Sequence, residues 1–480
     1  MTEDIERLEH IARQLEPDAG KRSAAQQQVL SYAENFLESI YTVPTYRKPA
    51  GAATGLWDSP ITEHPSALPE LLDLIKEHVD TPGINPASGG HLGYVPGGGV
   101  YYAALADYLA DVTNRYAGVY FANPGAVEME NLLIEWMASI TGYPENAAGN
   151  LTSGGSIANL ISIVAAREAF QAKAADFHRL VVYTTEQLHH SATKALRIVG
   201  LAEAPVRFIP IDERFRMRPD MLEQAIRRDE QAGLKPWLIM ASAGTTDTGA
   251  VDPLDTIAEI AKTHGLWHHV DGAYGAFFML TERGREVLRG IEKSDSLVMD
   301  PHKGLFLPYG TGAVLVKDRD VLFRAHRYHA NYMQDAVAPE GALSPADLSP
   351  ELTKHFRGLR MWLPLKLHGV APFRAALEEK LLLTRYFRNR LADMEGFELG
   401  PEPDLSITTF RYLPRHGDAD DFNRRLLQAI HEDGRVFLSS TQINGTFTLR
   451  LAVLCFRTHR QTIDLAIDIL AEKIRDLNNR

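Results

Sequence analysis

The middle of the sequence alternates short apolar runs with longer amphipathic stretches, and this alternation constrains the fold more than any other feature. The amphipathic stretches repeat apolar residues at helical spacing; they cover residues 156–170, 219–231 and 253–264. The apolar runs have the length of buried strands; they cover residues 180–183, 206–209, 237–240, 266–267, 297–299 and 313–316. Strands separated by helices pair in parallel, because each helix carries the chain back along the sheet. The sequence therefore predicts an α/β fold with a mostly parallel central sheet covered on both faces.

The regions that flank this alternation have different patterns. Residues 1–98 begin with helical patterning and become rich in Pro and Gly, so this segment cannot bury much apolar surface alone. Residues 353–480 contain a long helical stretch, an alternating strand at 446–453 and a final helix. We therefore predict three regions: an N-terminal helical and extended dimerisation segment at 1–98, a large domain at 99–352 and a small α+β domain at 353–480.

Composition excludes several classes of protein. The formal net charge is -12 and no basic run interrupts it, which argues against nucleic-acid binding. Cys455 is the only cysteine, so no disulfide forms within the chain, and its apolar neighbours predict a buried thiol. No apolar run approaches the roughly 18–20 residues of a transmembrane helix, and the first residues lack a signal-peptide pattern. We expect a cytoplasmic protein that does not enter the membrane.

Two predicted strands end in an amine and an acid. The run Leu297–Met299 is followed by Asp300-Pro301, a pair that ends the strand. His302 and Lys303 then lie at the carboxyl end of the strand, where open α/β sheets bind ligands. Asp271 follows another apolar run in the same way. Pyridoxal phosphate requires a Schiff-base lysine and an acid for its pyridinium nitrogen, so this pair indicates that cofactor.

A third element is the turn Ser153-Gly-Gly-Ser156, which opens a helical stretch. The free N–H groups and partial positive charge of a helix N-terminus suit a phosphate. Gly154 and Gly155 allow close approach of the backbone, and Ser156 adds a hydroxyl. Such a turn is by itself more often an ordinary loop, and it matches neither a P-loop nor a dinucleotide fingerprint. The phosphate interpretation depends on the other motifs.

Along the chain these motifs are Gly155-Ser156, His189-His190-Ser191, Gly244-Thr-Thr246, Asp271-x-Ala273 and His302-Lys303. In this order the sequence resembles the group II pyridoxal-phosphate-dependent decarboxylases, which include aromatic-L-amino-acid, tyrosine, histidine and glutamate decarboxylases. The resemblance extends from about residue 90 to the C-terminus and is most specific in His-Val-Asp-x-Ala-Tyr and x-Pro-His-Lys. It implies an aspartate-aminotransferase-like fold of type I, pyridoxal 5'-phosphate in the large domain, and a homodimer with its site at the subunit interface.

The resemblance also implies roles for single residues. Lys303 is similar to the lysine that forms the Schiff base, and Asp271 to the acid that keeps the pyridine nitrogen protonated. His189 is similar to the imidazole that stacks on the cofactor ring. Ala273 resembles the small residue beneath the ring, although a tight turn explains an alanine there without any cofactor. The remaining predicted cofactor contacts are Gly155, Ser156, Thr246 and His302.

Two histidine doublets and one arginine have other interpretations. The doublet His189-His190 suggests metal binding, but adjacent side chains diverge and no ligand set accompanies them. His268 and His269 are expected to point to opposite faces of one strand, so at most one reaches the cofactor. Arg450 either pairs with a carboxylate near the site or pairs within the small domain, and the second interpretation is favoured.

The substrate and the proton donor are the least determined parts of the site. The segment Tyr94-Val-Pro96-Gly97 resembles the substrate segment of the family, so Tyr94, Pro96 and Gly97 are predicted substrate contacts. Nearby tyrosines favour an aromatic or apolar amino acid. The family's aromatic-amino-acid decarboxylases deliver a proton from a tyrosine in a mobile loop, but the matching stretch 334–350 contains no tyrosine. Tyr332 lies just before it and is the candidate catalytic substitute; a structural role is about equally supported.

Three functions stay open at this stage. The favoured one is decarboxylation of an L-amino acid to its amine and CO2. The second is another outcome on the same cofactor: oxidative deamination to an aldehyde, carbon–carbon cleavage or transamination. The absence of a tyrosine from 334–350 motivates it, because a carbanion that is protonated slowly can react otherwise. The third is a non-enzymatic protein that binds the cofactor, which the full set of motifs disfavours.

Overall fold

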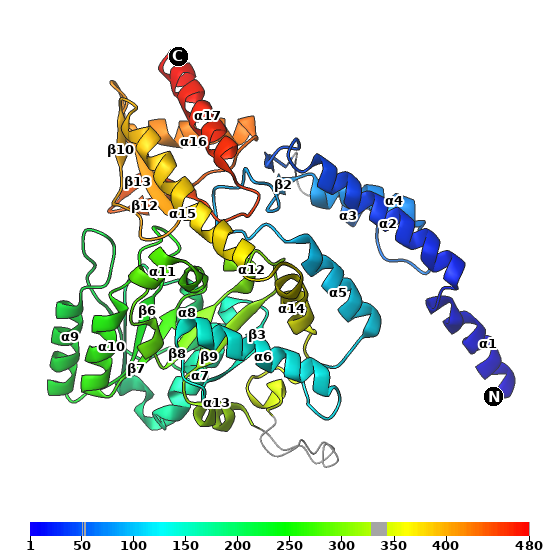
Figure 1. Ribbon diagram of the computed structural model, residues 1–480, viewed down its shortest axis with the longest axis horizontal. Coiled ribbons are helices and arrows are strands. Elements are labelled where there is room, and N and C mark those ends of the chain that lie inside the picture. The colour runs from blue at the N-terminus through cyan, green and yellow to red at the C-terminus, as the bar shows by residue number, and fades with distance from the viewer. Residues whose placement is uncertain (50, 52–53, 328–342, 480) are drawn as a thin grey trace.

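The computed structural model describes residues 1–49, 51, 54–327 and 343–479, and its largest unit is a seven-stranded sheet covered by helices (Figure 1). The strands lie in the order β3-β9-β8-β7-β6-β4-β5. All neighbours from β8 to β5 are parallel, and β9 is antiparallel to both of its neighbours. The predicted, mostly parallel sheet is confirmed. Its strands are β3 (Ala148–Thr152), β4 (Leu180–Thr184), β5 (Val206–Phe208), β6 (Lys235–Ser242), β7 (Trp267–Asp271), β8 (Ser296–Met299) and β9 (Gly312–Val316).

Helices cover both faces of this sheet, which explains why its strands appear in the sequence as continuous apolar runs. Successive residues of β4 enter different apolar clusters: Val181 packs in the cluster that contains Ile257 of α10, and Val182 in the cluster that contains Ala195 of α8. Burial on both faces removes the alternation that a half-exposed strand would show. The helices around the large sheet are α6 (Pro124–Thr141), α7 (Gly155–Ala169), α8 (His190–Ile198), α9 (Pro219–Gln231), α10 (Leu254–His264), α11 (Glu282–Val287) and α13 (Arg319–His326).

Strand β3 was not among the predicted strands. It contains Gly149 and Asn150, which are poor strand formers. Distant contacts hold it: Asn150 Nδ2 donates to the carbonyl of Pro345 at 2.9 Å, and Asn150 Oδ1 accepts from Lys354 Nζ at 2.8 Å. These partners lie about 200 positions away in the sequence, so local patterning cannot show the strand.

The C-terminal part forms a second, antiparallel sheet, as predicted. Its order is β10-β11-β13-β12, with β10 (Phe397–Leu399), β11 (Ile407–Tyr412), β12 (Ser439–Ile443) and β13 (Thr446–Ala452). The helices here are α15 (Ala371–Ala392), α16 (Ala419–Asp433) and α17 (Arg460–Asn478). Leu377 of α15 belongs to the apolar cluster of the large sheet, whereas Phe387 belongs to that of the small sheet. Helix α15 therefore joins the two cores, and Cys455 is buried as predicted.

The N-terminal helices project from the body of the molecule (Figure 1). They are α1 (Thr2–Ala12), α2 (Ala19–Ser39), α3 (Thr54–Trp57) and α4 (Leu68–Ile75). Strand β1 (Tyr46–Arg47), between α2 and α3, pairs with β2 (Gly83–Ile84), which follows α4. No residue of α1, α2 or α4 is buried. Helix α5 (Tyr101–Thr113) follows and packs against α14 (Arg357–His368). Over the described part of the chain, no helix combines the length and apolar character needed to cross a bilayer.

Candidate functional site

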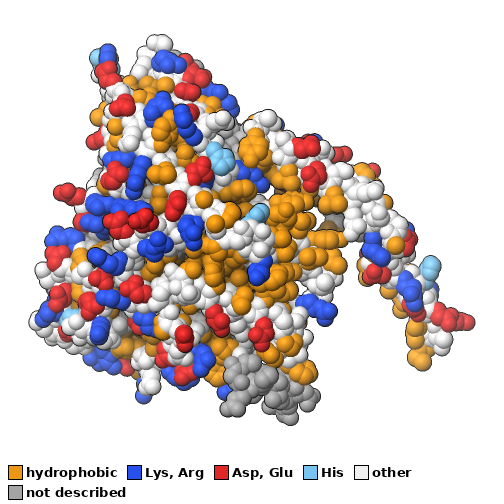
Figure 2. Space-filling view, viewed as in Figure 1, with side chains coloured by type: hydrophobic (Ala, Val, Ile, Leu, Met, Phe, Trp, Pro, Cys, Tyr) orange, Lys and Arg blue, Asp and Glu red, His pale blue; other side chains and the backbone are white. Residues whose placement is uncertain are grey.

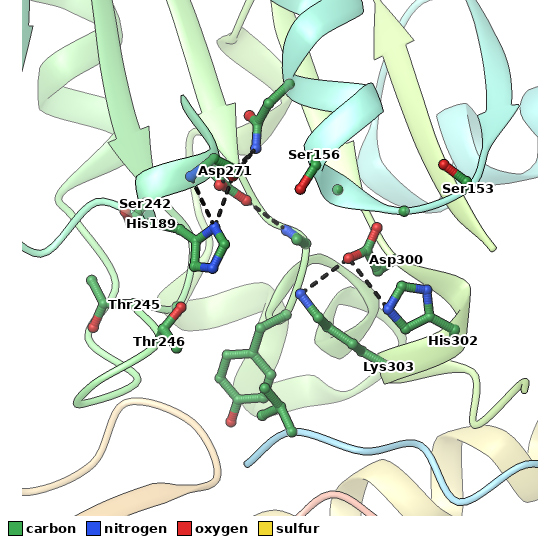
Figure 3. Close-up of a pocket in the computed structure, with 18 residues that line it drawn as sticks. Ser153, Ser156, His189, Ser242, Thr245, Thr246, Asp271, Asp300, His302 and Lys303 are labelled. Carbon is green, nitrogen blue, oxygen red and sulfur yellow. Dashed lines mark hydrogen bonds and ion pairs between the residues drawn. The ribbon is translucent and has the colours of Figure 1, made fainter. Parts of the chain in front are cut away.

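A cavity of about 360 Å³ opens at the carboxyl ends of β6, β7 and β8, beside the first turn of α7 (Figure 3). We call it the central pocket. All residues predicted to bind the cofactor line it; they are Gly155, Ser156, His189, Thr246, Asp271, Ala273, His302 and Lys303. The pocket lies where a parallel sheet is expected to bind ligands, because the carboxyl ends of its strands meet there.

The amine of Lys303 is presented by a short helix after β8. Pro301 occupies the first turn of α12 (Pro301–Gly304), and Asp300 precedes it. The Lys303 Nζ atom lies 3.0 Å from Asp300 Oδ2, and the Asp300 side chain is 2% exposed. The His302 ring is held in place by Nδ1, which donates to the carbonyl of Thr311 at 2.6 Å. The lysine is therefore a half-buried amine held by an ion pair, unlike an ordinary surface lysine.

The first turn of α7 forms the opposite wall of the pocket. It begins at Gly155, and no side chain among the described residues caps it. A Cβ at Gly155 would lie 3.3 Å from Ala273 Cβ and 3.0 Å from Asp300 Oδ2, so a larger residue would fit here only if these neighbours shifted. Uncapped N–H groups beside the hydroxyl of Ser156 form a site suited to an anion such as phosphate.

Asp271 and His189 complete the polar lining. Asp271 Oδ1 accepts from the N–H of Ala273 at 3.1 Å, and Oδ2 accepts from Asn159 Nδ2 at 3.0 Å. His189 is the N-cap of α8, with its Nδ1 2.8 Å from Ser191 Oγ. Burial lowers the pKa of His189 below its usual value, although the charge of Asp271 acts in the opposite direction. The pocket therefore combines a fixed carboxylate with an imidazole that favours its neutral form.

These groups fit pyridoxal phosphate. The Lys303 amine would hold the aldehyde carbon, Asp271 would face the pyridine nitrogen, and the α7 turn with Ser156 would hold the phosphate. The observation that carries the fit is the combination of an uncapped helix N-terminus and a buried carboxylate in one cavity with a lysine. When bound, this cofactor supplies an electron sink for the bond that breaks at Cα of an amino acid.

The three predicted substrate contacts do not line the central pocket, whereas their neighbour Val95 does. The Tyr94 ring packs 5.8 Å from that of Phe437, and 53% of the residue is exposed. A Cβ at Gly97 would lie 2.5 Å from the carbonyl oxygen of His302, so this glycine allows the segment to pack against the lysine turn. Pro96 is buried. Contacts between these residues and substrate stay a prediction, and Tyr332 lies outside the described residues.

Arg450 has partners that the sequence interpretation did not include. Its Nη1 donates to Ser439 Oγ at 3.0 Å within the small sheet, and also to the carbonyl of Gly93. Its Nε donates to the carbonyl of Asp247 at 2.9 Å. The expectation of a pairing within the small domain is therefore incomplete, because two of the three acceptors are backbone carbonyls from other regions. Arg450 links the small sheet to the loop after β6.

Sequence reasoning missed two residues of the pocket. Asn159 is 1% exposed and hydrogen-bonds Asp271, and it lies one helical turn after Ser156. A polar side chain on the inner face of an otherwise apolar helix was the available signal. Asp300 was interpreted only as the residue that ends a strand, yet its carboxylate is buried beside Lys303.

Comparison with known proteins identifies the family. A model of the pyridoxal-dependent decarboxylase conserved domain matches residues 56–413. The chain is 35% identical to aromatic-L-amino-acid decarboxylase of Bacillus atrophaeus, with 83% of this chain and 82% of that protein covered. It is 27% identical to phenylacetaldehyde synthase of Arabidopsis thaliana, covering 86% of this chain and 87% of that protein.

A solved structure supports the fold. The chain resembles the crystal structure of Oryza sativa TDC with PLP and tryptamine with a TM-score of 0.90 and 24% identity, covering 96% of this chain and 99% of that one. The predicted pyridoxal-phosphate fold is thus confirmed. The domain match covers more than half of the chain and includes the whole central pocket. The chain therefore belongs to the pyridoxal-dependent decarboxylase family, and it is an enzyme that uses pyridoxal phosphate to remove the carboxylate of an amino acid.

Proposed function

We propose that this enzyme converts an L-aromatic amino acid to its amine and CO2, using Lys303, Asp271 and His189 in the central pocket. The observation that carries the proposal is that Lys303 and Asp271 face one cavity from adjacent strand ends, beside the uncapped first turn of α7. The similarity to an aromatic-L-amino-acid decarboxylase supports the substrate class. The tyrosines that follow residue 93 support it too, because aromatic side chains pack well on one another.

Each side chain has a defined task. The Lys303 amine would hold the cofactor and would give up that place to the amine of the substrate. Asp271 would hold a proton at the pyridine nitrogen, because its two hydrogen bonds keep the carboxylate aimed at one position. The ring nitrogen of His189 on the pocket side is available to donate or accept a hydrogen bond. Decarboxylation follows if the pocket orients the carboxylate so that its bond to Cα is the one that breaks.

A second outcome, an aldehyde product, is favoured by one specific observation. Residues 334–350 contain no tyrosine, so the proton donor expected for amine formation is absent from that stretch. The similarity to phenylacetaldehyde synthase supports this alternative. In this proposal Tyr332 is the residue that decides the outcome. With Tyr332 as proton donor the product is the amine. Without a donor, dissolved O2 takes up two electrons and leaves as peroxide, and hydrolysis gives the aldehyde and ammonia.

A panel of amino acids tests both candidates. The holoenzyme is incubated with each aromatic amino acid, and CO2, amine, aldehyde and peroxide are quantified separately. We expect CO2 and amine in equal amounts; CO2 with aldehyde, ammonia and peroxide would establish the second candidate. Absence of CO2 across aromatic and other amino acids would refute both. Turnover that is lost in Lys303→Ala excludes a protein that only binds the cofactor.

We also propose that the protein is a homodimer, because an apolar face is exposed beside the N-terminal helices. Figure 2 shows hydrophobic side chains gathered in the middle of the molecule, over α5 and α14. On α5 the exposed residues are Tyr101, Tyr102, Tyr108, Leu109 and Val112. The N-terminal arm adds Ile5, Leu8, Ile11 and Leu15. Contiguous exposed apolar surface of this kind marks an interface, and a second copy that exchanges arms would cover both.

The dimer is tested by sedimentation of one matched pair of variants. Val112 is 65% exposed on the apolar face, and Ile198 is 62% exposed on α8. We expect Val112→Glu to shift the protein toward the monomer because a charge would be buried, and Ile198→Glu to leave the mass unchanged. A native protein that sediments as a monomer would refute the proposal.

We propose the cytoplasm as the compartment. The support is that the only cysteine, Cys455, is buried and has no partner cysteine, so the fold needs no oxidising environment. Fractionation of cells that express the protein tests this, and recovery with an exported marker would refute it.

A further inference from the structure

We infer that a hydrogen-bond relay that begins at Trp267 and passes through Asn159 decides which ring nitrogen of His189 carries its proton, and that the same relay holds Asp271 in position. Asn159, His269 and Ser296 are then positioning residues, since none of them needs to touch substrate. The inference rests on the proposed roles of His189 and Asp271 in the central pocket, but the direction of the relay follows from the folded chain alone.

The relay begins with a group that only donates. The indole Nε1–H of Trp267 donates to Ser296 Oγ at 2.9 Å. Ser296 Oγ in turn lies 2.9 Å from His269 Nδ1. Ser296 is 0% exposed and His269 is 1% exposed, so water does not compete for these bonds. Because Trp267 cannot accept, the direction of the first hydrogen bond is fixed; a serine oxygen can accept twice, so the direction of the second depends on His269.

The next group in the relay is His269, which uses both of its ring nitrogens. Burial lowers its pKa to about 4, so the ring is neutral near pH 7 and has one donor and one acceptor nitrogen. Nε2 lies 2.8 Å from Asn159 Oδ1, and an amide oxygen only accepts, so the proton lies on Nε2. Nδ1 is then the acceptor and takes the proton of Ser296 Oγ.

Asn159 then divides the relay into two branches. With its oxygen accepting, both hydrogens of Nδ2 are available. One goes to Asp271 Oδ2 at 3.0 Å and the other to Ser191 Oγ at 3.1 Å. A carboxylate oxygen accepts this bond, so Asp271 sets the orientation of the amide, and with it the direction of the bonds between Ser296, His269 and Asn159.

The second branch ends at the pocket. Ser191 Oγ accepts from Asn159 and lies 2.8 Å from His189 Nδ1. The Ser191 backbone N–H, which can only donate, points at the same nitrogen at 3.3 Å, so the Ser191 hydroxyl proton is free to go there too. Nδ1 is thus an acceptor, and the proton of neutral His189 lies on Nε2. In Figure 3 the other ring nitrogen of His189 lies on the side of the ring away from Asp271. The relay therefore presents the pocket with a donor for an anionic oxygen of substrate or cofactor.

Nitrogen NMR of the apoprotein tests the direction of the relay without cofactor or substrate. The histidines are labelled with ¹⁵N in the imidazole, and the His189 signals are those that vanish in His189→Gln. We expect the Nε2–H tautomer at pH 7.5. An Nδ1–H tautomer in the native protein would overturn the inference. The test needs no variant other than His189→Gln, which serves only to assign the signals.

A matched pair of variants on α7 tests whether Asn159 is the cause. In Asn159→Leu we expect a second His189 signal from the Nδ1–H form and pyridoxal phosphate binding weakened 10- to 100-fold, with kcat lowered more than KM. Ser162→Ala is the control, since Ser162 is buried on the same helix and, among the described residues, its hydroxyl bonds only the carbonyl of Ala158. A folded Asn159→Leu protein with native His189 signals would overturn the inference. An absence of CO2 in the substrate panel would instead refute the proposed function and leave the NMR result standing.

Discussion

The Nζ atom of Lys303 lies 3.0 Å from Oδ2 of Asp300, and this carboxylate also borders the first turn of α7. Its other oxygen, Oδ1, is buried and has no hydrogen-bond partner among the described residues. An acid therefore lies between the amine that would hold the cofactor and the helix N-terminus that would hold its phosphate. Sequence reasoning alone gave no role to this acid.

Replacing Asp300 by Asn removes the charge and keeps the shape. We expect Asp300→Asn to bind pyridoxal phosphate roughly tenfold more tightly, because it removes about 1.4 kcal/mol of repulsion from the phosphate. Fluorescence titration of the apoprotein measures this, with Asp318→Asn, at the start of α13, as the control. Weaker binding would show instead that the ion pair to Lys303 matters more than the repulsion.

We expect the buried His268 ring to make the folded state less stable in acid. It is buried in β7, neither ring nitrogen has a partner among the described residues, and burial is the main cause that lowers its pKa to about 3. The unfolded chain takes up this proton as the pH falls below about 6.5, and the folded chain does not, so the folded state loses stability from there down to the folded pKa. Between pH 7.5 and 5.5 the cost is about 1.4 kcal/mol.

His268→Leu removes that cost. Urea titrations measure the free energy of unfolding. We expect the native protein to lose about 1.4 kcal/mol more of it than His268→Leu between pH 7.5 and pH 5.5. His416→Asn, at an exposed position, serves as the control. Parallel pH dependence of the native protein and His268→Leu would contradict the assignment of the acid loss to this ring.

We expect a larger residue at Gly97 to displace the turn that carries Lys303. A methyl group there would lie 2.5 Å from the carbonyl oxygen of His302 and 2.7 Å from Phe306 Cα, and both are backbone atoms. We expect Gly97→Ala to cost roughly 1–3 kcal/mol in stability and to lower cofactor occupancy, because the turn must shift. In Gly358→Ala the new methyl meets nothing closer than 3.5 Å, so this helix variant should show neither effect. Full occupancy in Gly97→Ala would refute the predicted shift.

The buried pair Lys354 and Glu130 predicts strong coupling. Lys354 Nζ lies 2.7 Å from Glu130 Oε1 and also donates to the carbonyl of Leu151 in β3. Lys354→Met alone leaves a buried carboxylate unpaired and should cost roughly 3–5 kcal/mol, whereas adding Glu130→Leu should recover most of that loss. Unfolding titrations of the single and double variants measure the coupling. If the stability losses of the two single variants simply add in the double variant, the predicted coupling is contradicted.

The parts of the fold that sequence predicted are those set by local pattern. Strand β8 and helix α7 follow from apolar runs and helical spacing, and the chemistry of Lys303 and Asp271 follows from their position after such runs. Strand β3 could not be predicted, because Asn150 is held by Lys354 from far along the chain. Asn159 was missed for a related reason: its task depends on partners in α8 and β7, which only the folded chain brings together.

Borohydride reduction of the holoenzyme tests the central claim most directly. The reduced protein is digested, and mass spectrometry locates the lysine that carries the pyridoxyl group. The account predicts that Lys303 carries it and that Lys303→Ala, folded and treated in the same way, carries none. A pyridoxyl group on another lysine of the native protein, or one that persists in Lys303→Ala, would contradict the assignment of the central pocket as the cofactor site.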